Sequence, residues 1–140
     1  MRELKPRAWS IDSEYWCTRV DYDGYKEEWS GIVPVLAPDN RSKRIGEVED
    51  TNIIVEFPTD LKDKNGKMIY EGDIVKFRGR FYEVVFDDYG QFCLDNKKYH
   101  WLENRYSFNS VNIWKGDEIL VEIIGNIHEN PEILEAKNEI

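Results

Sequence analysis

Apolar and polar residues alternate in short runs along the second part of the chain, which is the pattern of β-strands with one buried face. The alternating apolar residues are Val75 and Phe77; Tyr82, Val84 and Phe86; Phe92 and Leu94; Tyr99 and Trp101; and Ile119, Val121 and Ile123. Glycine, aspartate and asparagine separate these runs and are typical of tight turns. We therefore predict a small β-barrel of the SH3-like or OB-like kind over residues 59–140.

Two short segments of this region carry signals of their own. Only Arg78, Gly79 and Arg80 separate Phe77 from Phe81, so the chain must turn back there in an antiparallel hairpin. Near the end, the segment Asn130–Glu132 offers a capping side chain, a proline and a carboxylate in sequence. This order predicts the start of a short C-terminal helix.

The first 58 residues have a weaker pattern. Residues 15–20 and 53–57 are predicted to be strands, whereas three prolines elsewhere remove hydrogen-bond donors that a strand would need. The polar run over residues 39–44 has no apolar period and predicts a mobile loop. We expect residues 1–58 to form an irregular, mostly β elaboration packed on the core.

Charge and the absence of long apolar runs narrow the classes of function. The 28 Asp and Glu residues outnumber the 19 Lys and Arg residues, and the net charge of −9 opposes general binding to a phosphate backbone. The acidic residues are spread along the whole chain, which is not the pattern of a DNA mimic. No apolar run approaches the roughly 20 residues that span a bilayer, and the charged start lacks a secretory pattern. We expect a cytoplasmic protein without membrane contact.

Residues that catalyse reactions or bind metals form no recognised pattern. Cys17, Cys93, His100 and His128 lack the short spacings of a zinc site. Cys93 and His100 lie in adjacent predicted strands, but Cys93 alternates like an ordinary strand residue. Nearly all of the clustered aspartates fall in predicted turns, where the side chain accepts backbone hydrogen bonds; the cluster consists of Asp60, Asp63, Asp73, Asp87, Asp88 and Asp95. We predict no metal, no cofactor and no enzymatic activity.

One local patch departs from the acidic character. Its basic residues alternate with aromatic ones: Lys76, Arg78, Arg80, Lys97 and Lys98 with Phe77, Phe81, Tyr82, Tyr99 and Trp101. Small barrels bind single-stranded nucleic acid with this mixture of charges and stacking faces. The alternative is a solvated hairpin tip whose aromatic residues belong to the core, and the net negative charge favours that alternative.

Three blocks of sequence, in order, resemble those of a known family. Residues 1–9, MRELKPRAW, are similar to the family's opening M-R-E-I-K-F-R-A-W-D. Residues 61–75, LKDKNGKMIYEGDIV, are similar to its central G-L-K-D-K-N-G-K-x-I-Y-E-G-D-I-V, and residues 124–134, IGNIHENPEIL, to its closing I-G-N-I-Y-E-N-P-E-L-L. The chain is thereby identified as resembling the YopX family of bacteriophage and prophage proteins.

The chain departs from the family pattern at four positions. Pro6 replaces an aromatic residue, Ser10 an aspartate, Asp60 a glycine and His128 a tyrosine. The resemblance implies a mostly β phage or prophage protein in the bacterial host cytoplasm, with an SH3-like barrel in its C-terminal part. It brings no catalytic or ligand-binding residues with it.

Aromatic residues are the feature that points to a function. The 5 Trp, 8 Tyr and 6 Phe residues exceed the needs of one small core, and aromatic residues are enriched at interfaces. We predict a non-enzymatic accessory protein that binds a macromolecular partner, with a host protein preferred and single-stranded nucleic acid as the alternative. A homo-oligomer is another way to cover these residues and the strand edges.

Two sets of residues are candidates for that interface. The first set, in the C-terminal part, consists of Tyr70, Arg78, Arg80, Tyr82 and Trp101. The second set consists of aromatic residues of the first 58 positions: Trp9, Tyr15, Trp16, Tyr22, Tyr25 and Trp29.

Overall fold

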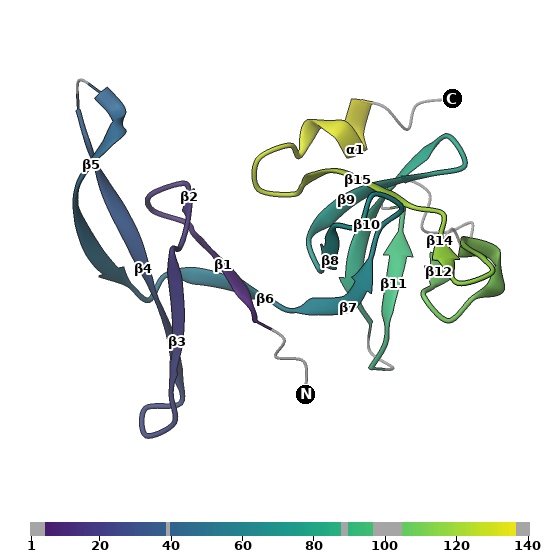
Figure 1. Ribbon diagram of the computed structural model, residues 1–140. Helices are drawn as coiled ribbons and strands as arrows, with labels where there is room; N and C mark the ends of the chain where they lie inside the picture. The colour runs from purple at the N-terminus through teal and green to yellow at the C-terminus, as the bar shows by residue number, and fades with distance from the viewer. Residues whose placement is uncertain (1–4, 39, 88–89, 97–104, 137–140) are drawn as a thin grey trace. The chain divides into compact units, whose positions relative to one another are not determined.

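A computed structural model describes residues 5–38, 40–87, 90–96 and 105–136. The chain consists of two compact units, an N-terminal unit over residues 1–57 and a C-terminal unit over residues 58–140. Most of the described regular structure in both units is β-strand, with one short α-helix near the C-terminus (Figure 1). The predicted mainly β fold is confirmed.

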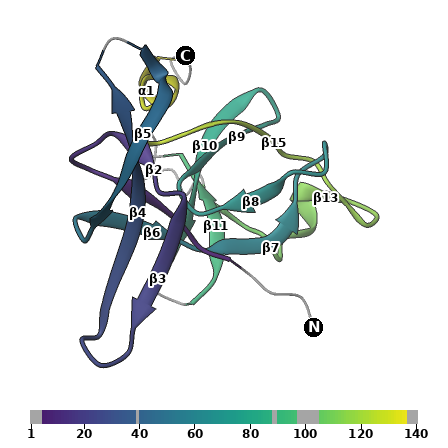
Figure 2. The ribbon, with the colours of Figure 1, turned by 60° about the vertical axis from the view of Figure 1, so that its left-hand side comes forward.

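The N-terminal unit contains two three-stranded antiparallel sheets, with strand orders β2-β1-β6 and β3-β4-β5 (Figure 2). Its strands are β1 (Arg7–Ser10), β2 (Tyr15–Trp16), β3 (Arg19–Asp23), β4 (Glu28–Ala37), β5 (Asn40–Asp50) and β6 (Ile53–Glu56). The strand predicted over residues 15–20 is in fact divided between β2 and β3. The division arises because the N–H of Cys17 donates to Ala8 in one sheet, whereas the N–H of Thr18 donates to Ile32 in the other.

The loop predicted over residues 39–44 is wrong for residues 40–44, which belong to β5. Residue 39 lies outside the described residues. The pairing of β5 with β4 places Asn40 opposite Ala37 and Arg44 opposite Leu36. Backbone hydrogen bonds make this ladder and do not require apolar side chains, so the polar sequence concealed the strand. The register shifts between Val35 and Leu36, which marks an irregularity in the middle of β5.

The C-terminal unit is built around a five-stranded antiparallel sheet of order β12-β11-β10-β9-β15. Its strands are β7 (Pro58–Lys62), β8 (Met68–Tyr70), β9 (Asp73–Phe77), β10 (Arg80–Phe86), β11 (Phe92–Asp95), β12 (Arg105–Ser107), β13 (Trp114–Lys115), β14 (Glu118–Ile119) and β15 (Glu122–Asn126). The 3-10 helix η2 spans Val111–Ile113, and the predicted C-terminal helix is present as α1, Glu132–Ala136.

The strands expected to form a small barrel do not close into one among the described residues. β12 and β15 are the two edges of the five-stranded sheet, and no hydrogen-bonded ladder joins them. The pairs β7–β8 and β13–β14 form separate two-stranded sheets instead of extending it. The hairpin predicted at Arg78–Gly79 is confirmed, because Phe77 pairs directly with Arg80. The strand predicted at Tyr99 and Trp101 lies outside the described residues.

The C-terminal unit has a well-defined hydrophobic core. Its buried members are Ile69, Val75, Phe77, Tyr82, Val84, Leu94, Phe108, Ile113, Ile119 and Val121. The ring of Tyr106 makes edge-to-face contacts with those of Phe77 and Tyr82, at centroid distances of 5.4 Å and 5.9 Å. By contrast, Ala8 and Val33 are the buried hydrophobic residues of the described N-terminal unit.

Two hairpin loops in each unit differ in the residue that adopts the left-handed conformation. In the C-terminal unit, Gly66 and Gly90 occupy this position, with φ of 83° and 79°. In the N-terminal unit, Glu14 and Glu27 occupy it, both with φ of 52°. A side chain with a Cβ pays a steric cost in this region that glycine does not pay.

Candidate functional site

In the first candidate set, Arg78 and Arg80 lie together at the protein surface. The ring of Tyr82, which was expected beside them, lies in the core instead. Arg78 and Arg80 are exposed at the tip of the β9–β10 hairpin, where Arg78 and Gly79 both have positive φ. The guanidinium of Arg78 lies 5.1 Å from the centroid of the Phe77 ring. Tyr82, however, is only 3% exposed and packs in the core. Its ring is therefore not available to stack on a base.

The environment of the Tyr82 hydroxyl also departs from that of a surface tyrosine. Burial, followed by the nearby Tyr106, raises the pKa of Tyr82 above its ordinary value of 10.0. Arg80 and Arg78 act in the opposite direction, but burial dominates. This hydroxyl therefore stays protonated at neutral pH.

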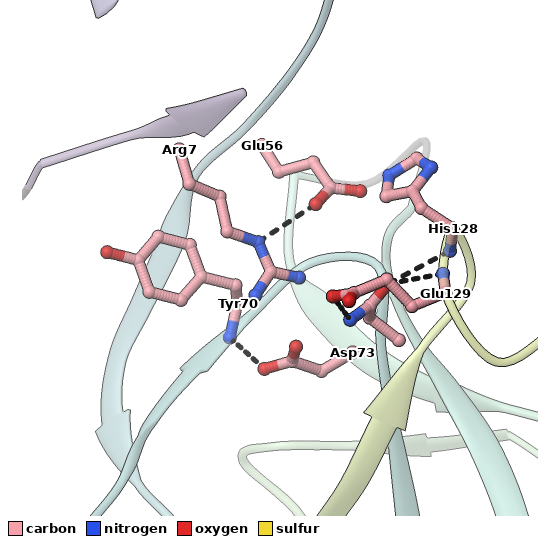
Figure 3. Close-up of polar contacts among 7 residues, drawn as sticks. Arg7, Glu56, Tyr70, Asp73, His128 and Glu129 are labelled. Carbon is pink, nitrogen blue, oxygen red and sulfur yellow. Dashed lines mark hydrogen bonds and ion pairs between the residues drawn. The ribbon is translucent and has the colours of Figure 1, made fainter. Parts of the chain in front are cut away.

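The other members of the first set are not brought to the same place. Tyr70 is half-buried at the end of β8, and its backbone N–H donates to Oδ2 of Asp73 at 2.8 Å (Figure 3). Tyr70 thus lies near the start of β9, whereas Arg78 follows the end of that strand. Trp101 lies outside the described residues, as do Lys97, Lys98, Tyr99 and His100.

The central sequence block, residues 61–75, forms a turn scaffold. The Asp63 side chain is buried, and its Oδ1 accepts from the N–H groups of Asn65 and Lys67, each at 2.9 Å. Its Oδ2 accepts from the N–H of Ile123 in β15, also at 2.9 Å. One carboxylate therefore closes the β7–β8 turn and joins it to a distant strand. The structural role predicted for turn aspartates is confirmed for Asp63 and, through similar bonds, for Asp73 and Asp87.

The closing block, residues 124–134, is likewise held by side chains that bind the local backbone. Oδ1 of Asn126 accepts from the N–H groups of His128 and Glu129, at 3.0 Å and 2.9 Å (Figure 3). Oδ1 of Asn130 accepts from the N–H of Asn126 at 3.3 Å, and a Cβ on Gly125 would lie only 2.6 Å from that oxygen. These contacts explain the sequence of the block without a ligand.

The described residues contain no group of three or more His, Cys, Asp or Glu side chains that could hold a metal ion. Burial, and after it the charge of Asp50, raises the pKa of the Cys17 thiol above its ordinary value, so the weakly nucleophilic thiol form prevails at neutral pH. Cys93 is buried in β11, and its predicted neighbour His100 lies outside the described residues. No helix in the described part of the chain has the length and apolar character that a membrane crossing requires.

Two clefts lie within the N-terminal unit. One, of about 320 Å³, is lined mainly by apolar residues: Ser13, Tyr15, Pro34, Val35, Leu36, Pro38 and Val48. The other, of about 420 Å³, is lined by Lys5, Pro6, Arg7, Cys17, Thr18, Arg19 and Val20. Its arginines already have acidic partners, because Arg7 pairs with Glu56 (Figure 3) and Arg19 with Asp21. Neither cleft combines a nucleophile with a general base.

Two exposed aromatic side chains and one half-buried one gather at one end of the β3-β4-β5 sheet. Tyr22 of β3 lies directly opposite Trp29 of β4, and their ring centroids are 5.0 Å apart. The ring of Phe57 meets Trp29 edge to face at 5.8 Å. Tyr22 is 52% exposed and Phe57 is 44% exposed. We call Tyr22, Trp29 and Phe57 the aromatic patch.

The aromatic patch continues a largely apolar face of the sheet. The strand register places Val20, Gly31, Val33 and Val48 on the same face as Tyr22 and Trp29. Sequence analysis pointed to Tyr22 and Trp29, but it missed Phe57. The signal was absent because only the fold shows that the residue after β6 contacts Trp29.

A comparison with protein families matches residues 5–135 to the family described as YopX protein. The chain belongs to the YopX family. The resemblance found in the sequence is thus confirmed over nearly its whole length. Among solved structures, the chain is similar to protein EF1440 from Enterococcus faecalis, with 28% sequence identity and a TM-score of 0.60. That likeness covers 96% of this chain and 99% of the other. No curated protein matches.

The matched range of this YopX-family chain includes both units and the whole aromatic patch. The likeness to EF1440 covers 96% of the chain and therefore includes most of each unit. The N-terminal unit is therefore part of the shared architecture and not an appendage peculiar to this chain.

Proposed function

We propose that this YopX-family protein is a non-enzymatic binding module that uses the aromatic patch to capture a basic segment of a host protein. The observation that carries the proposal is the cluster formed by the exposed Tyr22 and Phe57 around the half-buried Trp29, on a unit that buries few of its described apolar residues. Exposed aromatic clusters on soluble proteins mark interaction surfaces, where such residues supply much of the binding energy.

The net charge of the β3–β4 hairpin favours a cationic partner. Four exposed acidic residues, Asp21, Asp23, Glu27 and Glu28, outnumber the exposed Arg19 and Lys26 there. The strand register places Asp21, Asp23 and Glu28 on the face opposite to Tyr22 and Trp29, so their charge acts through the field of the hairpin and not by contact at the patch. An acidic element accelerates encounter with a basic surface and repels acidic ones. Aromatic faces bind guanidinium and ammonium groups by cation–π attraction. A segment rich in Arg or Lys satisfies both requirements.

Single-stranded nucleic acid, the alternative partner, has less support. The β9–β10 hairpin offers the charges of Arg78 and Arg80, but Phe77 and Tyr82 are both buried. Binding of single strands depends on exposed stacking faces as well as on charge. The excess of acidic over basic residues on the β3–β4 hairpin opposes the approach of phosphate groups.

The decisive experiment is affinity purification of the tagged protein from bacterial host cells, with identification of the retained proteins and nucleic acids. The test variant is Tyr22→Ala with Phe57→Ala, and the matched control is Arg78→Ala with Arg80→Ala. Circular dichroism verifies that both variants fold. We expect a protein partner that the control retains and the test variant binds at least about tenfold more weakly.

A labelled arginine-rich peptide and a labelled oligothymidylate, compared by fluorescence anisotropy at low salt, separate the two partners directly. Binding of the peptide that depends on Tyr22 and Phe57 supports the proposal. Binding of the oligonucleotide that depends on Arg78 and Arg80, without peptide binding, overturns it in favour of the nucleic-acid alternative.

A further inference from the structure

Strand β5 is an unpaired edge with a sequence unlike that of an ordinary protected edge. It has 11 residues, and in the described part of the chain it pairs on one side only, with β4. Such an edge presents backbone N–H and C=O groups to any strand that can align with it. Proteins usually block this pairing with charges, and the arrangement of the charges decides which pairings are blocked.

The charges of β5 are divided between its two halves. The first half is basic and the second is acidic, with Arg41, Lys43 and Arg44 before Ile45 and with Glu47, Glu49 and Asp50 after Gly46. Parallel pairing in register would place like charges together, which is unfavourable. Antiparallel pairing of two copies about a two-fold axis places each basic half beside an acidic half. The edge is therefore complementary to itself in one orientation only.

The residues at the centre of β5 provide a second, independent observation. Gly46 does not have the left-handed conformation that demands glycine, and a Cβ added to it would meet no atom within 4 Å. The register with β4 shifts beside this glycine, because Val35 pairs with Gly46 whereas Leu36 pairs with Arg44. Glycine inside a strand often marks such an irregularity, and it also marks places where another backbone approaches closely. The open space beside Gly46 leaves room for such an approach. Its neighbour Ile45 is 58% exposed, in the middle of an otherwise charged edge.

We propose that β5 pairs antiparallel with β5 of a second copy, about a two-fold axis between Ile45 and Gly46. This register places Ile45 opposite Gly46 of the second copy, so that the exposed isoleucine covers the glycine. It also places Arg44 opposite Glu47 of the second copy. Within one chain these two residues already form an ion pair, and in the dimer two such pairs form across the axis. The β3-β4-β5 sheet of one copy and the same sheet of the second copy thereby become one continuous sheet.

The dimer leaves the aromatic patch accessible. β3, which carries Tyr22, is the edge of the sheet opposite to β5. Two aromatic patches are then presented by one dimer, so a partner with two basic segments gains affinity through effective concentration. The dimer itself does not depend on the proposed partner, and either proposal can fail alone.

Sedimentation equilibrium at several concentrations and at low salt tests the proposal. We expect the wild-type mass to rise with concentration from 16.7 kDa toward twice that value. An acidic-edge variant, with Arg41, Lys43 and Arg44 each changed to Glu, is expected to dimerise at least about tenfold more weakly. A basic-edge variant, Glu47→Lys with Glu49→Lys, is expected to weaken by a similar factor. Mixing the two variants should restore a 1:1 dimer.

A charge-matched control carries Arg78→Glu, Arg80→Glu and Lys115→Glu outside β5, and we expect it to dimerise like the wild type. Asp50 is left unchanged because its carboxylate accepts from Ser10 and Asn52. A wild-type protein that stays monomeric at all concentrations overturns the proposal. So does an edge variant that still dimerises, or a mixture of folded variants that fails to associate. If the Tyr22→Ala, Phe57→Ala variant no longer dimerises, the dimer contact lies at the aromatic patch and not at β5, and the proposal is overturned as well.

Discussion

The two units of this chain use their apolar residues in opposite ways. The C-terminal unit gathers its apolar residues into one core of buried side chains from β8 to β14 and the segments around them. The N-terminal unit holds most of the exposed large apolar residues: Ile11, Tyr15, Tyr22, Tyr25, Val35, Ile45, Val48, Ile54 and Phe57. In the C-terminal unit, Phe86, Val111 and Leu120 are exposed. Among the described residues, the C-terminal unit thus buries most of its large apolar side chains, whereas the N-terminal unit leaves many of its own exposed.

The hairpin loops show the same difference. Asp63 and Asp87 begin loops that end in glycine, whereas Asp23 begins a loop that ends in Glu27 in the left-handed region. Backbone strain of this kind costs about 1–3 kcal/mol and persists where surrounding structure or function maintains it. The left-handed position of this N-terminal loop thus carries a glutamate where two C-terminal loops have glycine, although Asp60 and Arg78 of the C-terminal unit have positive φ as well.

The largest expected difference between the units is in the free energy of unfolding lost when an isoleucine is changed to alanine. Ile69→Ala removes a fully buried side chain of β8 and should lower the free energy of unfolding by about 4 kcal/mol, because it leaves a cavity. Ile54→Ala removes a 39% exposed side chain of β6 and should cost about 1 kcal/mol. Native-state hydrogen exchange, resolved by unit, measures both. Equal costs would contradict the contrast in burial.

The turn aspartates give the next largest effect. Asp63→Ala deprives three backbone N–H groups of their acceptor, one of them in β15, and should cost about 3 kcal/mol. Asp23→Ala removes an exposed acceptor for the N–H groups of Tyr25 and Lys26 and should cost about 1 kcal/mol. Urea denaturation of the two variants provides the comparison. A costlier Asp23→Ala would show that the N-terminal turn is the more important one.

Substitutions at the left-handed positions should change stability in opposite directions in the two units. Glu27→Gly relieves steric strain at an exposed position, and we expect a gain of about 1 kcal/mol. Gly66→Ala introduces that strain, and we expect a loss of about 1 kcal/mol, although a Cβ there would meet no neighbour within 4 Å. Thermal unfolding of both variants checks the signs. A loss from Glu27→Gly would mean that the Glu27 side chain makes a favourable contact larger than the strain.

The smallest expected effect on stability at neutral pH is that of Tyr82→Phe, and this effect increases at alkaline pH. Burial raises the pKa of Tyr82 above 10.0 in the folded protein, so above that pH the unfolded chain releases this proton first. Folded stability must then fall as the pH rises. Tyr82→Phe removes this contribution, and its stability relative to the wild type should increase from pH 9 to pH 11. Tyr25→Phe, at a fully exposed ring, is the matched control in the same denaturation series.

Sequence patterns predicted the C-terminal unit better than the N-terminal one, for physical reasons. Strands β9 and β10 alternate because one side chain in two enters the core, so Val75, Phe77, Tyr82 and Val84 all appear in the pattern. The same alternation does not distinguish an aromatic ring in the core from one on a binding surface. Tyr82 was therefore a candidate for binding, although it is buried.

In the N-terminal unit the pairing of backbones, and not burial, determines the strands. β5 consists mostly of charged and polar residues, and nothing in its hydrophobic pattern separates it from a loop. The aromatic patch likewise depends on a contact between Trp29 in β4 and Phe57, the residue after β6, and was predictable only in part. Strands with little core to face leave weak signals in a sequence.

The bond between Asp63 and Ile123 has a consequence for the synthesis of the protein on the ribosome. It joins residues that are 60 positions apart, and β9 likewise completes its pairing only when β15 is available. The salt bridge of Arg7 with Glu56 spans 49 positions, all within the part of the chain that is translated first. The N-terminal unit can therefore assemble on the ribosome while the C-terminal unit is still being made.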